Sequence, residues 1–318
     1  MPVMTKRHSL GHSLGRPLVV LAVLCGAWSI GALAAGALAA DPAHLSAPAA
    51  PSGTPAAVPA ATSPVGLPQA IARPPVPPYS AQPIGSYANG CIRGAGTLPP
   101  EGTGYQAVNL SRNRNHGHPD SIAFVQELAR RAQAERLGRL AIGDMSKPYG
   151  GRMESGHASH QIGLDVDVWF DLDQPPLARA DRERTDFPTM VNRSTQRVFP
   201  DRFGPRQARL LQMAATSSAV ARVFVNPAIK LALCEGETGD RSWLRKIRPW
   251  AGHDSHFHVR MNCPAGSTAC VSQDSIPPGD GCGQELMSWF EPPKEAPAPR
   301  PKAIPEPPAA CLAVLAGN

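Results

Sequence analysis

The sequence lacks the glycine-rich loops that hold phosphate groups. Neither a GxGxxG stretch nor a P-loop occurs, so nothing indicates a nucleotide site. It also lacks a basic cluster interleaved with aromatic residues, which argues against binding of nucleic acid. No Cys-x-x-Cys pair is present, and a cysteine-ligated metal site is therefore disfavoured. Aromatic residues make up only 5% of the chain whereas prolines number 36, which indicates that part of its 318 residues is linker.

The first forty residues have the pattern of a secretory signal peptide. Basic residues precede an apolar stretch over residues 17–33, and small residues continue to Ala40. We therefore predict a signal peptide over residues 1–40, with membrane contact only through this segment during export. An uncleaved anchor is the alternative, although the Gly and Ala of its second half are weakly hydrophobic. Cleavage leaves 28 basic residues against 25 acidic ones, a mild charge compatible with an acidic polymer such as a cell wall.

Six cysteines remain after cleavage, and an even number in an oxidising compartment indicates disulfides. The pairs that we predict are Cys91–Cys311, Cys234–Cys282 and Cys263–Cys270. The last pair closes a short loop, the first brackets the folded region, and the two remaining cysteines form the second.

The composition divides the mature chain into three parts. Residues 41–85 are rich in Pro, Ala and Ser with almost no charge, which predicts a tether that cannot bury enough apolar surface to fold. Residues 291–318 form a second proline-rich segment, a tail that ends in a disulfide-tied piece. Between them we predict one domain over residues 86–290.

Within this domain, helical periodicity predicts a helix that begins near Asp120, and a proline in the first turn predicts another from Pro205 to about Thr216. Short alternating segments predict strands over residues 164–170, 222–226 and 256–261. Helices and strands mix without a regular βαβ rhythm, so the predicted fold class is α+β. We expect a small central antiparallel sheet flanked by helices and loops and braced by disulfides.

Half of the chain's ten histidines lie in two short segments, GHASHQIGLDVD (156–167) and GHDSHFHVRMNCP (252–264). Any one of them could be a satisfied core histidine. Five together with two aspartates are harder to explain in that way, and histidine is the commonest protein ligand of metals.

Strand alternation predicts how these side chains meet. His256 and His258 share one strand face, and Asp165 and Asp167 share a face of another strand, just after His160. Both strand histidines could bind a metal, or one could bind it while the other moves protons. A His, a carboxylate and a second His form a three-ligand zinc site with an open position. A structural zinc site is the alternative, but such sites use four ligands, often cysteines.

Four stretches resemble the penicillin-insensitive murein endopeptidases, which are related to lysostaphin-type and D-alanyl-D-alanine peptidases and to the hedgehog domain. They are SRNRNHGHPD (111–120), GHASHQIGLDVDVWF (156–170), RVFVNPAIK (222–230) and GHDSHFHVRMNCP (252–264). The resemblance spans about residues 90–285. It implies a periplasmic metalloprotease that hydrolyses the D-alanyl–meso-diaminopimelyl amide of peptidoglycan. Because no serine acyl-enzyme forms, the activity is expected to be insensitive to penicillin.

The resemblance also implies a role for each residue of the two segments. The implied Zn²⁺ ligands are His160, Asp167 and His258, with His157 close by as a candidate ligand of a second ion. The implied general base is His256, with His253 assisting at the oxyanion or the leaving amine. Asp165 is expected to orient a ligand imidazole from behind.

Two other functions stay open at this point. A D,D-carboxypeptidase or dipeptidase on the same scaffold would need a pocket for a terminal carboxylate, for which Arg152 and Arg260 are available. A zinc-bearing wall-binding module would also fit the tether. The presence of His253 and His256 beyond the ligand set argues against a pure binding module.

Overall fold

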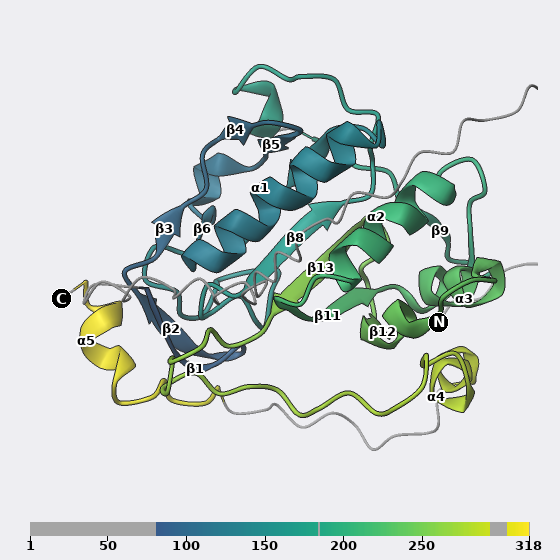
Figure 1. Cartoon of the computed structure of the whole chain (residues 1–318). Helices are drawn as coiled ribbons and strands as arrows, with labels where there is room; N and C mark the ends of the chain where they lie inside the picture. Colours follow the sequence, from purple (N-terminus) through teal and green to yellow (C-terminus); the bar gives the residue numbers. More distant parts are fainter. Residues whose placement is uncertain (1–80, 184, 293–303, 318) are drawn as a thin grey trace, which may run out of the picture. The chain divides into compact units, whose positions relative to one another are not determined.

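The computed structural model describes residues 81–183, 185–292 and 304–317 (Figure 1). The predicted signal peptide and residues 41–80 of the predicted tether lie outside the described residues. The first strand, β1 (Gln82–Ser86), begins inside the segment predicted as tether, so folded structure starts earlier than residue 86. Its Ile84 is buried against Cys91, Cys311 and Val314, which explains why this end of the segment is ordered. Within the described ranges, no helix is both long and apolar enough to cross a bilayer.

A seven-stranded sheet forms the centre of the folded part, in the order β12-β11-β13-β8-β7-β5-β4. Its strands are β4 (Glu101–Gly102), β5 (Tyr105–Ala107), β7 (Leu140–Ile142), β8 (Asp165–Trp169), β11 (Val220–Val225), β12 (Ile247–Pro249) and β13 (His256–Met261). The α+β class is confirmed, but the predicted small antiparallel sheet is wrong. The sheet is mixed, because β5 pairs with β7 and β11 pairs with β12 in parallel. β5 and β7 are buried throughout and therefore show no alternation in the sequence.

The central strands β8 and β13 follow the alternation expected from the sequence. They pair antiparallel, with Asp167 opposite His258 and Asp165 opposite Arg260. These four side chains therefore share one face of the sheet. The other face carries residues that are fully buried in the core: Val166, Val168, Phe257 and Val259.

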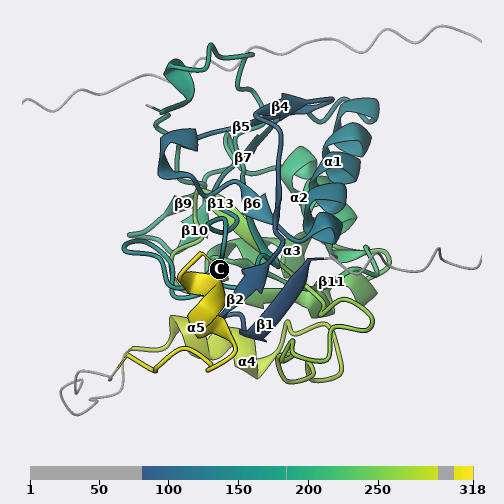
Figure 2. The same cartoon turned by 90° about the vertical axis from the view of Figure 1, so that its left-hand side faces the viewer.

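Two helices cover this apolar face, α1 (Pro119–Ala134) and α2 (Pro205–Ala215). Each has a proline in its first turn, where the missing N–H costs no helical hydrogen bond. In the turned view, both helices lie to the right of β13, and the hairpin of β9 (Val191–Asn192) and β10 (Arg197–Val198) lies to the left (Figure 2). The helices thus shield the core and leave the opposite, polar face of the sheet to loops.

Smaller elements complete the described part. They are β2 (Asn89–Arg93), β3 (Gly96–Thr97), β6 (His116–Gly117), α3 (Pro227–Gly236), α4 (Gln284–Met287), α5 (Cys311–Leu315), and the 3₁₀ turns η1 (Leu110–Arg112), η2 (Asp181–Glu183), η3 (Ser242–Lys246) and η4 (Ser288–Phe290). Three disulfides tie them together, in the predicted pairs: Cys91–Cys311, Cys234–Cys282 and Cys263–Cys270. The first joins β2 to α5, the second joins α3 to the segment before α4, and the third closes the loop after β13.

Candidate metal centre

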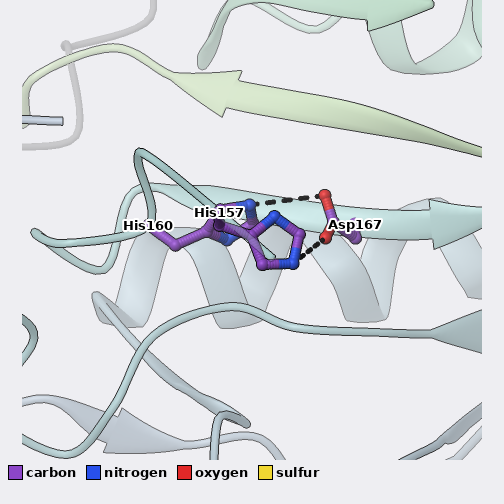
Figure 3. Close-up of side chains that lie close together, drawn as sticks. All are labelled: His157, His160 and Asp167. Carbon is purple, nitrogen blue, oxygen red and sulfur yellow. Dashed lines mark ion pairs between the residues drawn. The ribbon is translucent and has the colours of Figure 1, made fainter. Parts of the chain in front are cut away.

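Three imidazoles converge on the carboxylate of Asp167 in the middle of β8, and Figure 3 shows two of them, those of His157 and His160. The Oδ1 atom of Asp167 lies 3.4 Å from Nε2 of His160 and 3.5 Å from Nδ1 of His258. Its Oδ2 atom lies 3.4 Å from Nε2 of His157. All of these groups are buried except His157, which is partly exposed. The sheet thus brings together the residues of two segments that lie about ninety positions apart in the sequence.

These separations fit a shared metal ion. In a tetrahedral site with ligands at about 2.0–2.2 Å, neighbouring ligand atoms are about 3.3–3.6 Å apart. Both contacts at Oδ1 of Asp167 fall in this range. In addition, Nε2 of His160 and Oδ1 of Asp167 are buried and have no hydrogen-bond partner among the described residues. Buried polar atoms are normally paired, so these two suit a metal ligand role. The ligand atoms of His157, His160 and Asp167 also form a group compact enough to hold an ion.

The rings of His160 and His258 are each oriented by a hydrogen bond on the side that faces away from Asp167. Nδ1 of His160 lies 2.7 Å from the carbonyl oxygen of Met145, so this nitrogen carries a proton and Nε2 is the atom that could bind a metal ion. His258 is turned the other way, because its Nε2 lies 2.9 Å from Oδ1 of Asp165. Asp165 also accepts a hydrogen bond of 2.9 Å from the backbone N–H of His160. One carboxylate therefore contacts both the imidazole of His258 and the backbone of His160.

Gly163 makes the turn between His160 and β8 possible. Its φ of +70° lies in the left-handed region, and an added Cβ would lie 2.6 Å from Cδ1 of Ile92 and 3.0 Å from the backbone nitrogen of His118. Only glycine satisfies both conditions without strain. His160 itself has a φ of 66°, so the turn that presents this histidine is conformationally costly.

Arg260 neutralises the buried carboxylate of Asp165. Its Nε donates to Oδ1 at 2.8 Å and its Nη2 to Oδ2 at 3.3 Å, and its guanidinium lies 4.3 Å from the ring centre of Tyr87. Burial raises the pKa of Asp165, but Arg260 and His258 lower it more, and the net pKa is well below the ordinary value. Arg260 is thus occupied in the fold. Arg152, the other arginine considered for a substrate carboxylate, is exposed.

The electrostatics of the centre favour a cation. Burial lowers the pKa of His160, but the carboxylates of Asp167 and Asp165 raise it, to about 9. Burial raises the pKa of Asp167, but His160, His256 and His258 lower it well below the ordinary value. A metal ion would replace the proton that the ion pair otherwise holds on His160.

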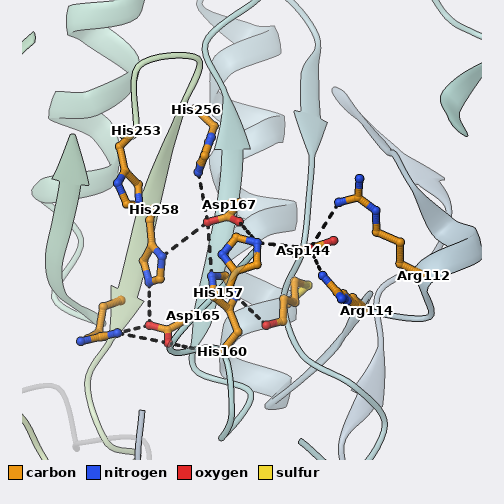
Figure 4. Close-up of polar contacts among 12 residues, drawn as sticks. Arg112, Arg114, Asp144, His157, His160, Asp165, Asp167, His253, His256 and His258 are labelled. Carbon is orange, nitrogen blue, oxygen red and sulfur yellow. Dashed lines mark hydrogen bonds and ion pairs between the residues drawn. The ribbon is translucent and has the colours of Figure 1, made fainter. Parts of the chain in front are cut away.

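His256 and His253 lie beside this group (Figure 4). Nε2 of His256 is 3.9 Å from Oδ1 of Asp167, and its ring centre is 5.1 Å from those of Trp169 and His253. Burial, and to a smaller extent the neighbouring imidazoles of His256 and His258, lower the pKa of His253 to about 4, so it is neutral at pH 7. The loop that carries His253 is held by Asn226, which donates its backbone N–H to the carbonyl of His253 and its Nδ2 to that of Gly252, both at 3.0 Å.

Asp144, which was not predicted from the sequence, lies on the other side of the centre. Its Oδ2 lies 3.2 Å from Nε2 of His157 and accepts a hydrogen bond of 2.8 Å from Arg114, with Arg112 at 3.5 Å (Figure 4). Burial raises the pKa of Asp144, but hydrogen bonds from His157 and Arg114 lower it more. Two features of the sequence could have indicated it: its position two residues after the buried strand β7, and the two arginines in SRNRNHGHPD. His157 is thus held between two carboxylates, Asp144 and Asp167.

Comparison with known proteins identifies the family. The sequence model of a family described as penicillin-insensitive murein endopeptidase matches residues 83–316. A penicillin-insensitive murein endopeptidase of Haemophilus influenzae is 48% identical over 238 residues, which cover 74% of this chain and 82% of that protein. One of Salmonella paratyphi C is 49% identical over 239 residues, covering 75% of this chain and 87% of that protein. With most of its folded part matched and half of the aligned residues identical, the chain belongs to the penicillin-insensitive murein endopeptidase family.

Proposed function

We propose that the chain is a zinc-dependent endopeptidase that hydrolyses the D-alanyl–meso-diaminopimelyl cross-link of peptidoglycan. Family membership and the names of the relatives support action on murein. One observation carries the metallopeptidase assignment: Oδ1 of Asp167 lies at 3.4 and 3.5 Å from one nitrogen each of His160 and His258, with two further histidines beside it. A structural metal site would not need these additional imidazoles.

The ligands proposed for the ion are His160, Asp167 and His258. When bound, zinc supplies Lewis acidity to the substrate carbonyl and lowers the pKa of a water molecule to about 7. The donor set of two neutral imidazoles and one carboxylate leaves a net positive charge at the site, which favours a developing oxyanion.

His256 is proposed as the general base. Its partly exposed imidazole lies at the start of β13, 3.9 Å from the ligand oxygen of Asp167, within reach of a reacting water molecule. His253 has its Nδ1 atom 3.0 Å from the carbonyl oxygen of Ala251, so Nδ1 donates and Nε2 remains free to accept a proton. The proton that His256 takes from the water is proposed to pass through His253, whose pKa of about 4 makes it a ready donor, to the leaving amine. The mechanism has no serine acyl-enzyme, which explains an activity insensitive to penicillin.

The carboxypeptidase alternative is less well supported. It requires a cation for a terminal carboxylate, and of the two arginines considered, Arg260 already binds Asp165 and stacks on Tyr87, which leaves only Arg152. The decisive experiment compares purified cross-linked muropeptide dimers with monomeric pentapeptides, by chromatography, with and without a chelator. We expect dimers to become monomers, chelation to stop the reaction and zinc to restore it. Release of D-alanine from pentapeptides alone would support the carboxypeptidase, and binding without any soluble product would support a wall-binding module.

We also propose that the mature protein works in the periplasm. The signal-peptide pattern of residues 1–40 and the three disulfides support export to an oxidising compartment. Cell fractionation with N-terminal sequencing of the recovered protein tests this. A protein recovered from the cytoplasm with its first forty residues intact would contradict the proposal.

A further inference from the structure

Two indole rings lie close together on the surface near the metal centre. Trp250 is 54% exposed and Trp289 is 39% exposed, and their ring centres are 6.5 Å apart at an interplanar angle of 51°. Tryptophan carries the largest apolar surface of any side chain and is usually well buried. A pair of exposed indoles is therefore a candidate binding surface.

This pair is continuous with the proposed active site. Trp250 follows β12 and lies three residues before His253 in the same loop. Its ring packs edge-on against Phe224 at 5.6 Å, and Phe224 packs edge-on against the ligand His258 at 5.3 Å. Aromatic rings thus lead from a proposed metal ligand to the surface.

The backbone that presents the two indoles is firmly held. The backbone N–H of Trp250 donates to the carbonyl of Val225 at 2.8 Å. The segment before Trp289 is fixed by the Cys234–Cys282 disulfide, by the ion pair of Arg248 with Glu285, and by Leu286, which is fully buried. The exposure of the rings is therefore a property of a rigid surface, and a rigid surface loses little entropy when it binds a ligand.

We propose that Trp250 and Trp289 form a subsite that stacks on the N-acetylhexosamine rings of the glycan strand, an inference that rests on the proposed function. The stem peptide of murein is built from small and charged residues and offers little apolar surface to an indole. The sugar ring offers an apolar face of C–H groups, with polar groups only at its edge. Four extended residues span at most about 14 Å, which is the reach from the cross-link to the sugar. Trp250 lies two ring-to-ring steps, of 5.3 and 5.6 Å, from His258, within that reach.

A matched pair of substrates tests the subsite in cleavage. Muropeptide dimers are prepared with their disaccharides, and the same dimers are prepared after an amidase has removed the sugars. For the Trp250→Ala/Trp289→Ala double variant, the ratio of kcat/KM on the sugar-carrying dimer to that on the sugar-free dimer should fall about 10-fold, mainly through KM. Val271→Ala, which also removes an exposed apolar side chain, is the control and should leave the ratio unchanged. An unchanged ratio in the double variant overturns the proposal.

A binding measurement separates this inference from the proposed function. Glycan strands stripped of their stem peptides contain no cross-link, and their binding to the chelator-treated protein is measured by calorimetry. We expect the double variant to bind at least about 10-fold more weakly than wild type. Weaker binding of stripped glycan by the double variant supports the subsite whether or not the wild-type protein cleaves the dimers. If the wild type cleaves neither dimer, only the endopeptidase proposal is contradicted. Failure of the wild type to bind stripped glycan, or a change of oligomeric state in the double variant in place of weaker binding, overturns the subsite.

Discussion

Replacement of Asp165 by Asn tests how the metal ligands are held. The carboxylate accepts hydrogen bonds from His258 Nε2 at 2.9 Å, from the backbone N–H of His160 at 2.9 Å and from Arg260 at 2.8 and 3.3 Å. The amide of the new Asn has the same shape as the carboxylate, but one of its two acceptor oxygens is replaced by an NH₂ donor. This donor would face one of the N–H groups that now donate to Asp165. His258 then loses a charged partner that fixes its orientation, and residues in this role typically contribute about 10- to 100-fold to metal affinity. We expect the zinc Kd to rise by that factor, about 1.4–2.7 kcal/mol.

The same substitution should also destabilise the metal-free protein, because it leaves the guanidinium of Arg260 without its carboxylate. Breaking a buried ion pair costs about 3–5 kcal/mol, and the remaining contact of Arg260 with Gln273, at 2.8 Å, should reduce this to the lower end. Competition with a chromophoric chelator measures the zinc affinity, and urea unfolding of chelator-treated protein measures the stability. An Asp165→Asn/Arg260→Gln double variant is the matched control. It should recover stability but not zinc affinity, since His258 still lacks its partner. Wild-type zinc affinity in Asp165→Asn would refute the role given to Asp165.

Three further predictions concern the same centre. His258→Ala should lose zinc, whereas His256→Ala should keep zinc and lose about 100- to 10,000-fold in turnover. Metal content and cleavage are measured on the same preparations, and loss of zinc in His256→Ala with zinc kept in His258→Ala would show that the two roles are reversed. Because the pKa of His160 is raised to about 9, its imidazole carries an extra proton at pH 7 that zinc must displace. Zinc affinity, measured by competition titration, should therefore rise by up to about 10-fold per pH unit between pH 7 and 9. An affinity that does not change with pH in this range would show that His160 is already neutral in the metal-free protein. Gly163→Ala should destabilise the chelator-treated protein by at least about 2 kcal/mol, because φ is +70° and the new Cβ would meet Ile92; unchanged urea unfolding would contradict the strain argument.

The sequence predicted those parts of the fold in which a local pattern is long enough to be read. β13 has the predicted bounds, and β8 lies inside the predicted range 164–170, because both alternate over five or six residues. The mixed sheet could not be predicted, since β4, β5, β7 and β12 are only two or three residues long. Pairing of such short strands depends on tertiary contacts rather than on local pattern.

Some residues of the candidate site could likewise be predicted from the sequence, and others could not. The histidines and aspartates of the two segments were indicated by their clustering in the sequence, and strand alternation sends Asp165, Asp167, His256 and His258 to one face. Asp144 was missed because a single aspartate after a short strand has no pattern, and only the fold places it 3.2 Å from His157. Arg260 was considered for a substrate carboxylate, whereas the structure pairs it with Asp165. The register between two strands decides which charged side chains lie opposite one another, and this register cannot be predicted from the sequence of one strand alone.

The register of β8 and β13 explains how two aspartates on one strand face take different roles. Asp167 lies opposite His258, so imidazoles surround it, whereas Asp165 lies opposite Arg260 and is neutralised. A slip of one residue would turn the histidines into the apolar core and is therefore excluded by hydrophobic burial. A slip of two residues would keep the pattern of faces but would set His256 opposite Asp167 and Arg260 opposite Gly163. That arrangement would leave the buried carboxylate of Asp165 without a permanent cation, at a cost of several kcal/mol. The ion pair of Asp165 and Arg260 therefore selects, among registers that bury the same apolar residues, the one that places His258 opposite Asp167.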